Sequence, residues 1–190
     1  MSSIVKESIC NDAYRYYGDR SLRARIKTYV FQGAYKYTKT YRRVNYYYKS
    51  NKKIRYFFMR LLLLRKSYKY GYQINEKAQI GDGLYLGHRG TIIINGDAVL
   101  GNNINIQAGV TIGQENRGER IGAPQIGNEV WIGGNAVVVG KITIGNNVLI
   151  APNSFVNKDI PSDSIVVGNP IRIIHNKEAT VGYIQNKVDI

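Results

Sequence analysis

A six-residue spacing of large aliphatic side chains limits what this chain can fold into. From residue 74 onward these side chains recur at every sixth position in three blocks. Small residues, mainly glycine, commonly follow them, and a smaller apolar residue usually stands four positions later. The aliphatic positions are Ile74, Ile80, Leu86, Ile94, Leu100, Ile106, Ile112, Ile126, Ile132, Val138, Ile144, Ile150 and Val156.

A period of six fits neither the stripe of an amphipathic helix nor the alternation of a half-buried strand. It suits a chain that runs a short strand, turns a corner and repeats, so that stacked coils bury a continuous aliphatic column. Glycine and asparagine tolerate the backbone angles of tight corners. Ordinary sandwich strands are the alternative, but they do not explain three blocks with a constant step. We therefore predict a parallel β-helix over residues 73–174.

The first 72 residues have a different chemistry. They contain 18 Lys and Arg against 3 Asp and Glu, a net charge of +15, and they hold 14 of the 16 tyrosines. We expect residues 1–72 to form an α-helical N-terminal region. One helix should end at Gly18, and another should begin at a cap on Asn51 and end at Gly71. Residues 175–190 are expected to form a C-terminal tail.

The basic region needs a partner or bulk water. In its last predicted helix, Ile54, Phe58, Leu61, Arg65 and Tyr68 share one face. This face would dock on the β-helix or on a neighbouring subunit, or it would contact an anionic membrane. An acidic polysaccharide would be attracted by the same field. Nucleic acid is the competing class of partner, and it is disfavoured because the chain has no recognised nucleic-acid motif.

The sequence favours a cytoplasmic protein. The most apolar run, IRYFFMRLLLLRK, is interrupted by Arg55 and Arg60 and is too short to cross a bilayer. The first twenty residues lack the apolar stretch of a secretory signal. The single cysteine, Cys10, cannot form an internal disulfide, which fits a reducing compartment. A peripheral location at the inner face of the cytoplasmic membrane is compatible with the basic helices.

Five segments of the repeat carry a resemblance to a known family. IGDGLYLGH, NINIQAGVTIG, IGNEVWIGGNAVVVG, ITIGNNVLIAPNSFV and GNPIRII resemble the hexapeptide-repeat acyltransferases. The match is best to the serine acetyltransferase-like branch, especially to members from surface-polysaccharide gene clusters. The resemblance implies a left-handed coil, acetyl-CoA as cosubstrate, and homotrimers with active sites between subunits. No metal is expected, because a β-helix carbonic anhydrase needs three histidine ligands and this chain has two histidines.

The repeat is interrupted at residues 86–94 and 112–126, and loops inserted into a rigid repeat often carry function. The first break holds His88, the second is polar and glycine-rich, and both could face one pocket. Imidazole titrates near neutrality and can take a proton from an alcohol that attacks a thioester. The resemblance makes His88 the general base, with backbone near Gly113 as a donor to the oxyanion. The alternative is a corner histidine bonded only to backbone, and His175 is expected to be a solvated surface residue.

The resemblance also places coenzyme A in a groove between coils. A basic side chain for a phosphate is part of that arrangement, and Lys158 is the one best placed for it. A solvated loop lysine is the alternative reading of this residue. The matching positions are Gly113, Gly134, Pro152, Asn157, Lys158 and Arg172.

The group that orients the general base differs from that of serine acetyltransferases. Those enzymes pair the histidine with an aspartate fifteen residues earlier, and this chain has Gln73 there. Gln73 could hold the ring of His88 by a hydrogen bond but could not stabilise an imidazolium as a carboxylate would. Glu76 and Asp82 are further candidates.

The positions that meet the acceptor also differ. In serine acetyltransferases an aspartate meets the substrate ammonium and an Arg-His pair meets the carboxylate, whereas this chain has Gly87, Gly122 and Ala123. Serine is therefore disfavoured, and we expect acetylation of a sugar hydroxyl in surface or capsular polysaccharide biosynthesis. Arg117 and Arg120 would meet an acidic sugar. A serine O-acetyltransferase is the alternative enzyme, and a non-enzymatic β-helix scaffold is the alternative class.

Overall fold

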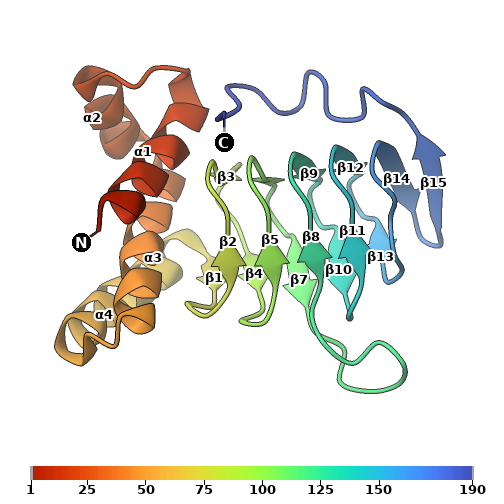
Figure 1. Ribbon diagram of the computed structural model, residues 1–190, viewed down its shortest axis with the longest axis horizontal. Coiled ribbons are helices and arrows are strands. Elements are labelled where there is room, and N and C mark those ends of the chain that lie inside the picture. Colours follow the sequence, from red (N-terminus) through yellow and green to blue (C-terminus); the bar gives the residue numbers. More distant parts are fainter. Residues whose placement is uncertain (1, 190) are drawn as a thin grey trace.

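The computed structural model describes residues 2–189 and consists of four helices followed by a coiled β-structure (Figure 1). The helices are α1 (Ser3–Tyr17), α2 (Leu22–Phe31), α3 (Gly33–Lys49) and α4 (Lys53–Tyr70). They gather at the end of the β-structure where the first coil begins. No helix among the described residues is long and apolar enough to cross a membrane.

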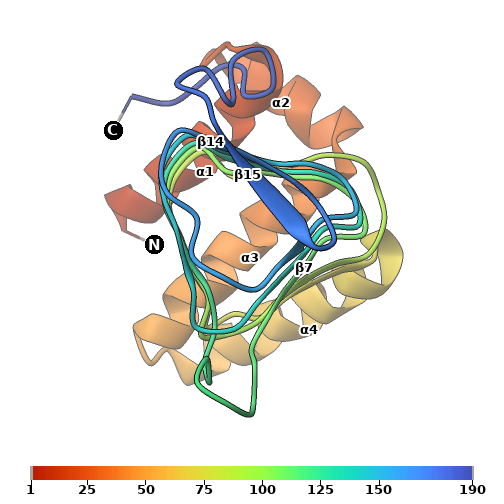
Figure 2. The same ribbon diagram turned by 90° about the vertical axis from the view of Figure 1, so that its right-hand side faces the viewer.

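The β-structure is a left-handed parallel β-helix with three faces, as predicted, and its triangular section is seen in Figure 2. Sheet A contains β1 (Tyr72–Ile74), β4 (Ile92–Ile94), β7 (Thr111–Gly113), β10 (Val137–Val139) and β13 (Phe155–Val156). Sheet B contains β2 (Gln79–Ile80), β5 (Val99–Leu100), β8 (Gln125–Ile126) and β11 (Thr143–Ile144). Sheet C contains β3 (Tyr85–Leu86), β6 (Asn105–Ile106), β9 (Val130–Ile132), β12 (Val148–Ile150), β14 (Ser164–Gly168) and β15 (Ile171–His175), of which β15 is antiparallel to β14.

The aliphatic repeat forms the core that its spacing predicts. In sheet A, Ile74 pairs with Ile94, Ile94 with Ile112, and Ile112 with Val138, so that one inward column runs through successive coils. All repeat positions are buried except Ile80, which is half-buried. Each buried aliphatic side chain contributes about 1.5–3 kcal/mol relative to an exposed one, and the stacking therefore supplies most of the cohesion.

Polar side chains of α1 and α3 cover the open edge of the first coil. A solenoid ends in strands whose outer N–H and C=O groups have no partner strand, and such an edge is prone to pair with other chains. Here the Ile74 N–H donates to the Tyr37 hydroxyl, and the Tyr41 hydroxyl donates to the Ala78 carbonyl at 2.8 Å. These α3 side chains therefore take the place of a neighbouring strand.

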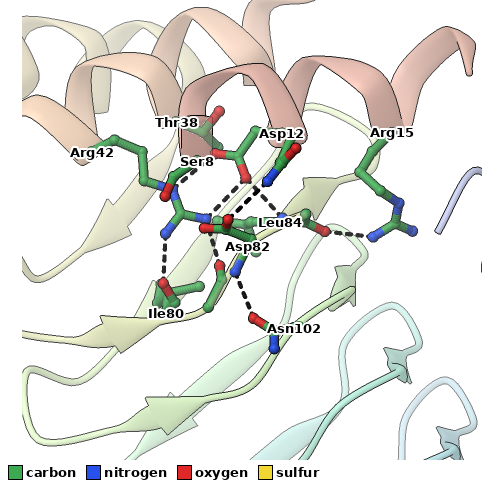
Figure 3. Close-up of polar contacts among 12 residues, drawn as sticks. Ser8, Asp12, Arg15, Thr38, Arg42, Ile80, Asp82, Leu84 and Asn102 are labelled. Carbon is green, nitrogen blue, oxygen red and sulfur yellow. Dashed lines mark hydrogen bonds and ion pairs between the residues drawn. The ribbon is translucent and has the colours of Figure 1, made fainter. Parts of the chain in front are cut away.

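A buried ion pair joins α1 and α3 above the same edge (Figure 3). Arg42 donates to both carboxylate oxygens of Asp12 at 2.9 Å, and the two side chains are 8% and 0% exposed. The same guanidinium donates to the carbonyls of Ile80 and Gly81, and Asp12 accepts the Leu84 N–H. The ion pair thus links two helices and the coil edge in one network.

The helix boundaries agree with the sequence at two glycines and differ at one cap. Gly18 and Gly71 end α1 and α4 in the left-handed conformation, as expected. The expected cap at Asn51 is wrong, because Asn51 has φ +52° in the turn after α3 and Lys52 precedes the first residue of α4. The apolar face of α4 that contains Phe58 does not dock on the β-helix of the same chain, since α4 buries only Leu63 and Tyr70.

Residues 176–189, which we call the strap, run back along sheet C to α1 (Figure 1). Asn105 donates to the Tyr183 carbonyl, and the Arg15 Nε donates to the Gln185 carbonyl at 3.1 Å. Val188 is buried, and its N–H and C=O both bond to the side chain of Asn103. The expected C-terminal tail is therefore packed along its length.

Replacing Arg42 with Ala should lower the free energy of unfolding by about 3–5 kcal/mol, because the carboxylate of Asp12 would stay buried without its partner. Urea denaturation followed by circular dichroism would measure this change. Lys49→Ala, at an exposed position of the same helix, is the matched control and should change stability by less than about 0.5 kcal/mol. Equal stability of the two variants would contradict the role given to the ion pair.

Replacing Arg15 with Met should loosen the strap, because the side chain donates to the Gly83 carbonyl, the Asn105 Oδ1 and the Gln185 carbonyl. A hydrogen bond to a charged group contributes about 1.5–3 kcal/mol, so amide exchange in the strap should accelerate at least tenfold. Hydrogen–deuterium exchange read by mass spectrometry would detect it. Arg23→Met, at an exposed position of α2, should leave exchange unchanged, and a strap unaffected by the Arg15 substitution would show that other contacts hold it.

Candidate active site

His88 lies where the first break leaves the β-helix, at the corner between sheets C and A. The chain leaves β3 at Leu86 and enters β4 at Ile92, and the intervening residues bulge outward with His88 exposed. Gly134 and Pro152 occupy the same corner in later coils, since they follow β9 and β12 of sheet C. The backbone links these coils, because the Asn153 N–H donates to the Gly134 carbonyl. One edge of the prism therefore carries His88, Gly134 and Pro152.

An open cavity of about 470 Å³ adjoins His88. Its walls come from α1, the junction of α2 and α3, the corners of the first coils, and the strap. Aromatic rings and amides make up much of its lining, with His88, Arg15 and Arg89 as its basic groups, and no Asp or Glu among the described residues lines it. Its aromatic and amide residues are Tyr16, Phe31, Tyr72, Tyr85, Trp131, Tyr183, Gln32, Asn105, Gln107, Gln185 and Asn186.

Gln107 occupies the space in front of Gly87, next to His88. A Cβ added at Gly87 would lie 2.2 Å from the Oε1 of Gln107, so a side chain at position 87 would require Gln107 to move. The hydroxyl of Tyr72 donates to the His88 carbonyl at 3.4 Å. Burial raises the pKa of Tyr72 to about 12, so its phenol stays protonated at neutral pH. The neutral phenol of Tyr72 therefore donates a hydrogen bond to the backbone carbonyl of His88.

The structure separates Gln73 from His88. Gln73 projects outward from β1 and lines a second cavity of about 510 Å³ with residues of α4, and His88 is not part of that cavity. The hydrogen bonds within residues 2–189 include none between the two side chains. Glu76 accepts from the Tyr56 hydroxyl and pairs with Arg60 at 2.9 Å, and Asp82 accepts from Asn11. Both carboxylates have other partners, and neither bonds to His88.

The second break projects from the opposite edge of sheet A, at its corner with sheet B (Figure 1). Residues 114–124 leave β7 just after Gly113 and form a hairpin closed by two backbone bonds between Glu115 and Gly122. Arg120 donates to the Asn157 carbonyl, and Lys158 is the next residue and is exposed. This edge therefore brings together Gly113, Arg120, Asn157 and Lys158.

Two further predicted residues stand apart from these groups. Arg117 is exposed at the tip of the hairpin without a side-chain hydrogen bond or ion pair within residues 2–189. Arg172 is exposed on β15 of sheet C, opposite Val167. His175, at the end of the same strand, is exposed. The two breaks of one chain do not share a cavity, because sheet A lies between them.

No local pattern in the sequence predicts the cavity itself, because three segments distant in sequence build it. Gln107 is the residue that sequence inspection could have found. It follows Ile106 in the repeat, and Gly87 follows Leu86 at the equivalent corner, so register alone places Gln107 one coil from His88. The contributions of Trp131 and Tyr183 depend on the path of the strap, where their rings meet edge to face at 5.0 Å.

Comparisons with known proteins agree with this fold. Residues 123–158 match the family described as bacterial transferase hexapeptide (six repeats). The chain is 38% identical to serine acetyltransferase of Staphylococcus xylosus over 133 residues, which cover 69% of this chain and 61% of that protein. It is 37% identical to serine acetyltransferase 2 of Arabidopsis thaliana over 114 residues, covering 60% of this chain and 35% of that protein. The chain thus spans between about a third and three fifths of these relatives.

Solved structures cover more of the chain. Serine acetyltransferase of Neisseria gonorrhoeae in complex with serine is 31% identical, with a TM-score of 0.76, and the match covers 91% of this chain and 70% of that one. Serine acetyltransferase of Brucella abortus in complex with coenzyme A is 28% identical, with a TM-score of 0.74, and the match covers 92% of this chain and 68% of that one. On the fold, the repeat and these matches, the chain belongs to the serine acetyltransferase family of hexapeptide-repeat transferases.

Proposed function

We propose that this protein is an acetyl-CoA-dependent O-acetyltransferase of the serine acetyltransferase type, with His88 as its general base. The observation that carries the proposal is an exposed imidazole at a break in the repeat, beside a cavity whose lining, within residues 2–189, includes no Asp or Glu. The relative from Brucella abortus, solved with coenzyme A, supports the cosubstrate. A non-enzymatic scaffold would not explain why the repeat is interrupted at His88.

The proposed reaction is a direct transfer. His88 takes the proton of the acceptor hydroxyl while the oxygen attacks the thioester carbonyl. A tetrahedral oxyanion forms, with backbone N–H groups near Gly113 on the loop edge of the adjoining copy as candidate donors. The intermediate collapses by breaking its C–S bond, and the thiolate of coenzyme A takes the proton from the imidazolium. The acetyl ester and free coenzyme A are released, and no covalent enzyme intermediate is needed.

The cosubstrate is assigned to the edges of the prism. Gly134 and Pro152 lie on the same edge as His88, so the pantetheine arm would run along these corners toward the imidazole. Gly134 suits this corner because there is little room for a side chain. A Cβ there would lie 3.3 Å from the Ala108 carbonyl oxygen. Lys158, exposed beside Asn157 on the other edge of sheet A, is assigned to a phosphate. Arg172, exposed on β15, is the second basic candidate.

A complete site requires two subunits under this proposal. His88 and the loop with Arg117 and Arg120 lie on opposite edges of sheet A, so one chain cannot bring them to one acceptor. Packing the His88 edge of one copy against the loop edge of the next would do so, and repetition of this contact closes a ring. A homotrimer, the assembly that the resemblance to hexapeptide-repeat acyltransferases implies, is the proposed form.

Serine is the proposed acceptor, because the gonococcal relative was solved with serine and the relatives named above are serine acetyltransferases. The expectation of a capsular or surface-polysaccharide substrate has no support in those relatives. One observation keeps a sugar hydroxyl as the second candidate. A serine ammonium calls for a countercharge, but no Asp or Glu in the described part of the chain lines the His88 cavity, and Gln107 lies in front of Gly87.

Replacing His88 with Ala should lower kcat/KM for acetyl transfer at least about a hundredfold, because the acceptor hydroxyl would lose its base. Release of free thiol from acetyl-CoA, followed with a thiol-reactive dye, measures the rate. His175→Ala removes the other histidine, at an exposed position outside the cavity, and should keep full activity. If the His88 variant were as active as the wild-type protein, the general base would lie elsewhere.

The acceptor is tested by comparing L-serine with neutral and acidic glycosides in the same thiol-release assay. With serine as the acceptor, L-serine should saturate the enzyme and yield O-acetylserine by mass spectrometry. Turnover of a glycoside, with serine inactive, would select the second candidate and retain the role of His88. Thiol release with neither acceptor class, in the presence of a folded protein, would count against the transferase.

A further inference from the structure

The outward face of α4 is apolar and unusually exposed. Ile54, Phe57, Phe58, Leu61 and Tyr68 are 76%, 58%, 65%, 49% and 83% exposed. They recur at intervals of three and four residues, so they form one stripe along the helix. Soluble proteins seldom leave an apolar patch of this kind uncovered, and this stripe therefore indicates a contact surface.

Cations lie on the same face, and carboxylates do not. Arg65 and Lys69 fall within the stripe by helical spacing, with Arg55 beside it, and α4 contains no Asp or Glu. On the opposite side of the helix, Lys66 donates to the Lys36 carbonyl and to Thr40. Burial, together with the charges of Arg43, Lys39 and Lys36, lowers the pKa of Lys66 to about 8. The side of α4 that faces α3 is thus also basic, and the carboxylate that α4 contacts, Glu76, is paired with Arg60.

Three kinds of occupant can be compared: a second copy, a nucleic acid and a lipid bilayer. One of them matches both the apolar stripe and the positive charge. A second α4 packed face to face would bring arginines and lysines together without a carboxylate from either helix. A nucleic acid would match the charge but leave Phe57, Phe58 and Leu61 in water. An anionic lipid bilayer matches both properties, because acyl chains cover the apolar stripe while Arg and Lys side chains extend to the headgroups.

We propose that α4 docks on an anionic lipid bilayer, lying in the plane of the interface with its outward face at the boundary between headgroups and acyl chains. The helix lies flat rather than spanning, in agreement with its composition. α4 belongs to the helical end of the molecule, away from β15 (Figure 1), so docking there leaves the later coils of the β-helix clear of the bilayer. The proposal is independent of the acetyl acceptor.

Co-sedimentation of the full chain with vesicles tests this proposal. Binding to vesicles of equal parts phosphatidylglycerol and phosphatidylcholine should be strong and salt-sensitive, and binding to phosphatidylcholine alone should be weak. The double variant F58S/L61S should lower partitioning at least about tenfold, through loss of apolar contact. R65Q/K69Q should lower it roughly fivefold for each cation removed and should reduce the salt dependence.

The matched control is V181S/K177Q, which removes an exposed apolar residue and an exposed cation from the strap and should bind vesicles as the wild-type protein does. Thermal melting checks that every variant is folded. Unchanged partitioning of both α4 variants would overturn the proposal. A second result would also overturn it: F58S/L61S binds vesicles as the wild-type protein does but has a lower particle mass than the wild-type protein in light scattering. That result would assign the face to a contact with a second copy. Displacement from vesicles by duplex RNA at matched phosphate concentration would assign it to nucleic acid.

Discussion

The open edge of the first coil is the constraint on which the rest of the structure depends. Within a β-helix each strand finds partners in the coils before and after it, but the first coil has none on one side, and unpaired buried backbone groups cost about 1–3 kcal/mol each. Side chains of α1 and α3 fill this role through Tyr37, Tyr41, Asp12 and Arg42. The helices are therefore the end cap of the solenoid, and their position follows from its hydrogen-bonding needs.

The candidate active site results from the same docking. Once α1 lies across the first coil, Arg15 reaches the Gly83 carbonyl and the Gln185 carbonyl of the strap. The strap then passes over sheet C, and the space left between helix, coil corner and strap is the cavity beside His88. Since a rigid repeat presents the histidine and two peripheral segments wall the cavity, changes in those segments can alter the acceptor without disturbing the base.

The sequence predicts the fold well because one period encodes it: positions three six-residue steps apart pair in register on successive coils, as Ile94 and Ile112 do. It also places His88 at a corner, because only a broken repeat leaves room for an outward bulge. The partners of Glu76 and Asp82, the separation of Gln73 from His88, and the path of the strap could not be predicted. They depend on side-chain bonds between segments far apart in sequence, such as Asn103 with Val188, and no local pattern specifies these.

The high tyrosine and arginine content of the first 72 residues is explained in part by the contacts of the helices with the first coil. A tyrosine can be buried and still donate a hydrogen bond at its far end, so it can pack in a helix interface and reach a strand carbonyl, as Tyr41 does. Arginine serves the same edge with several donors, and Arg42 contacts three residues at once. Edge capping therefore accounts for part of the tyrosine and arginine content on the inner side of the helices. It does not account for Arg65 and Lys69, which are exposed on the outer face of α4 and require a different explanation.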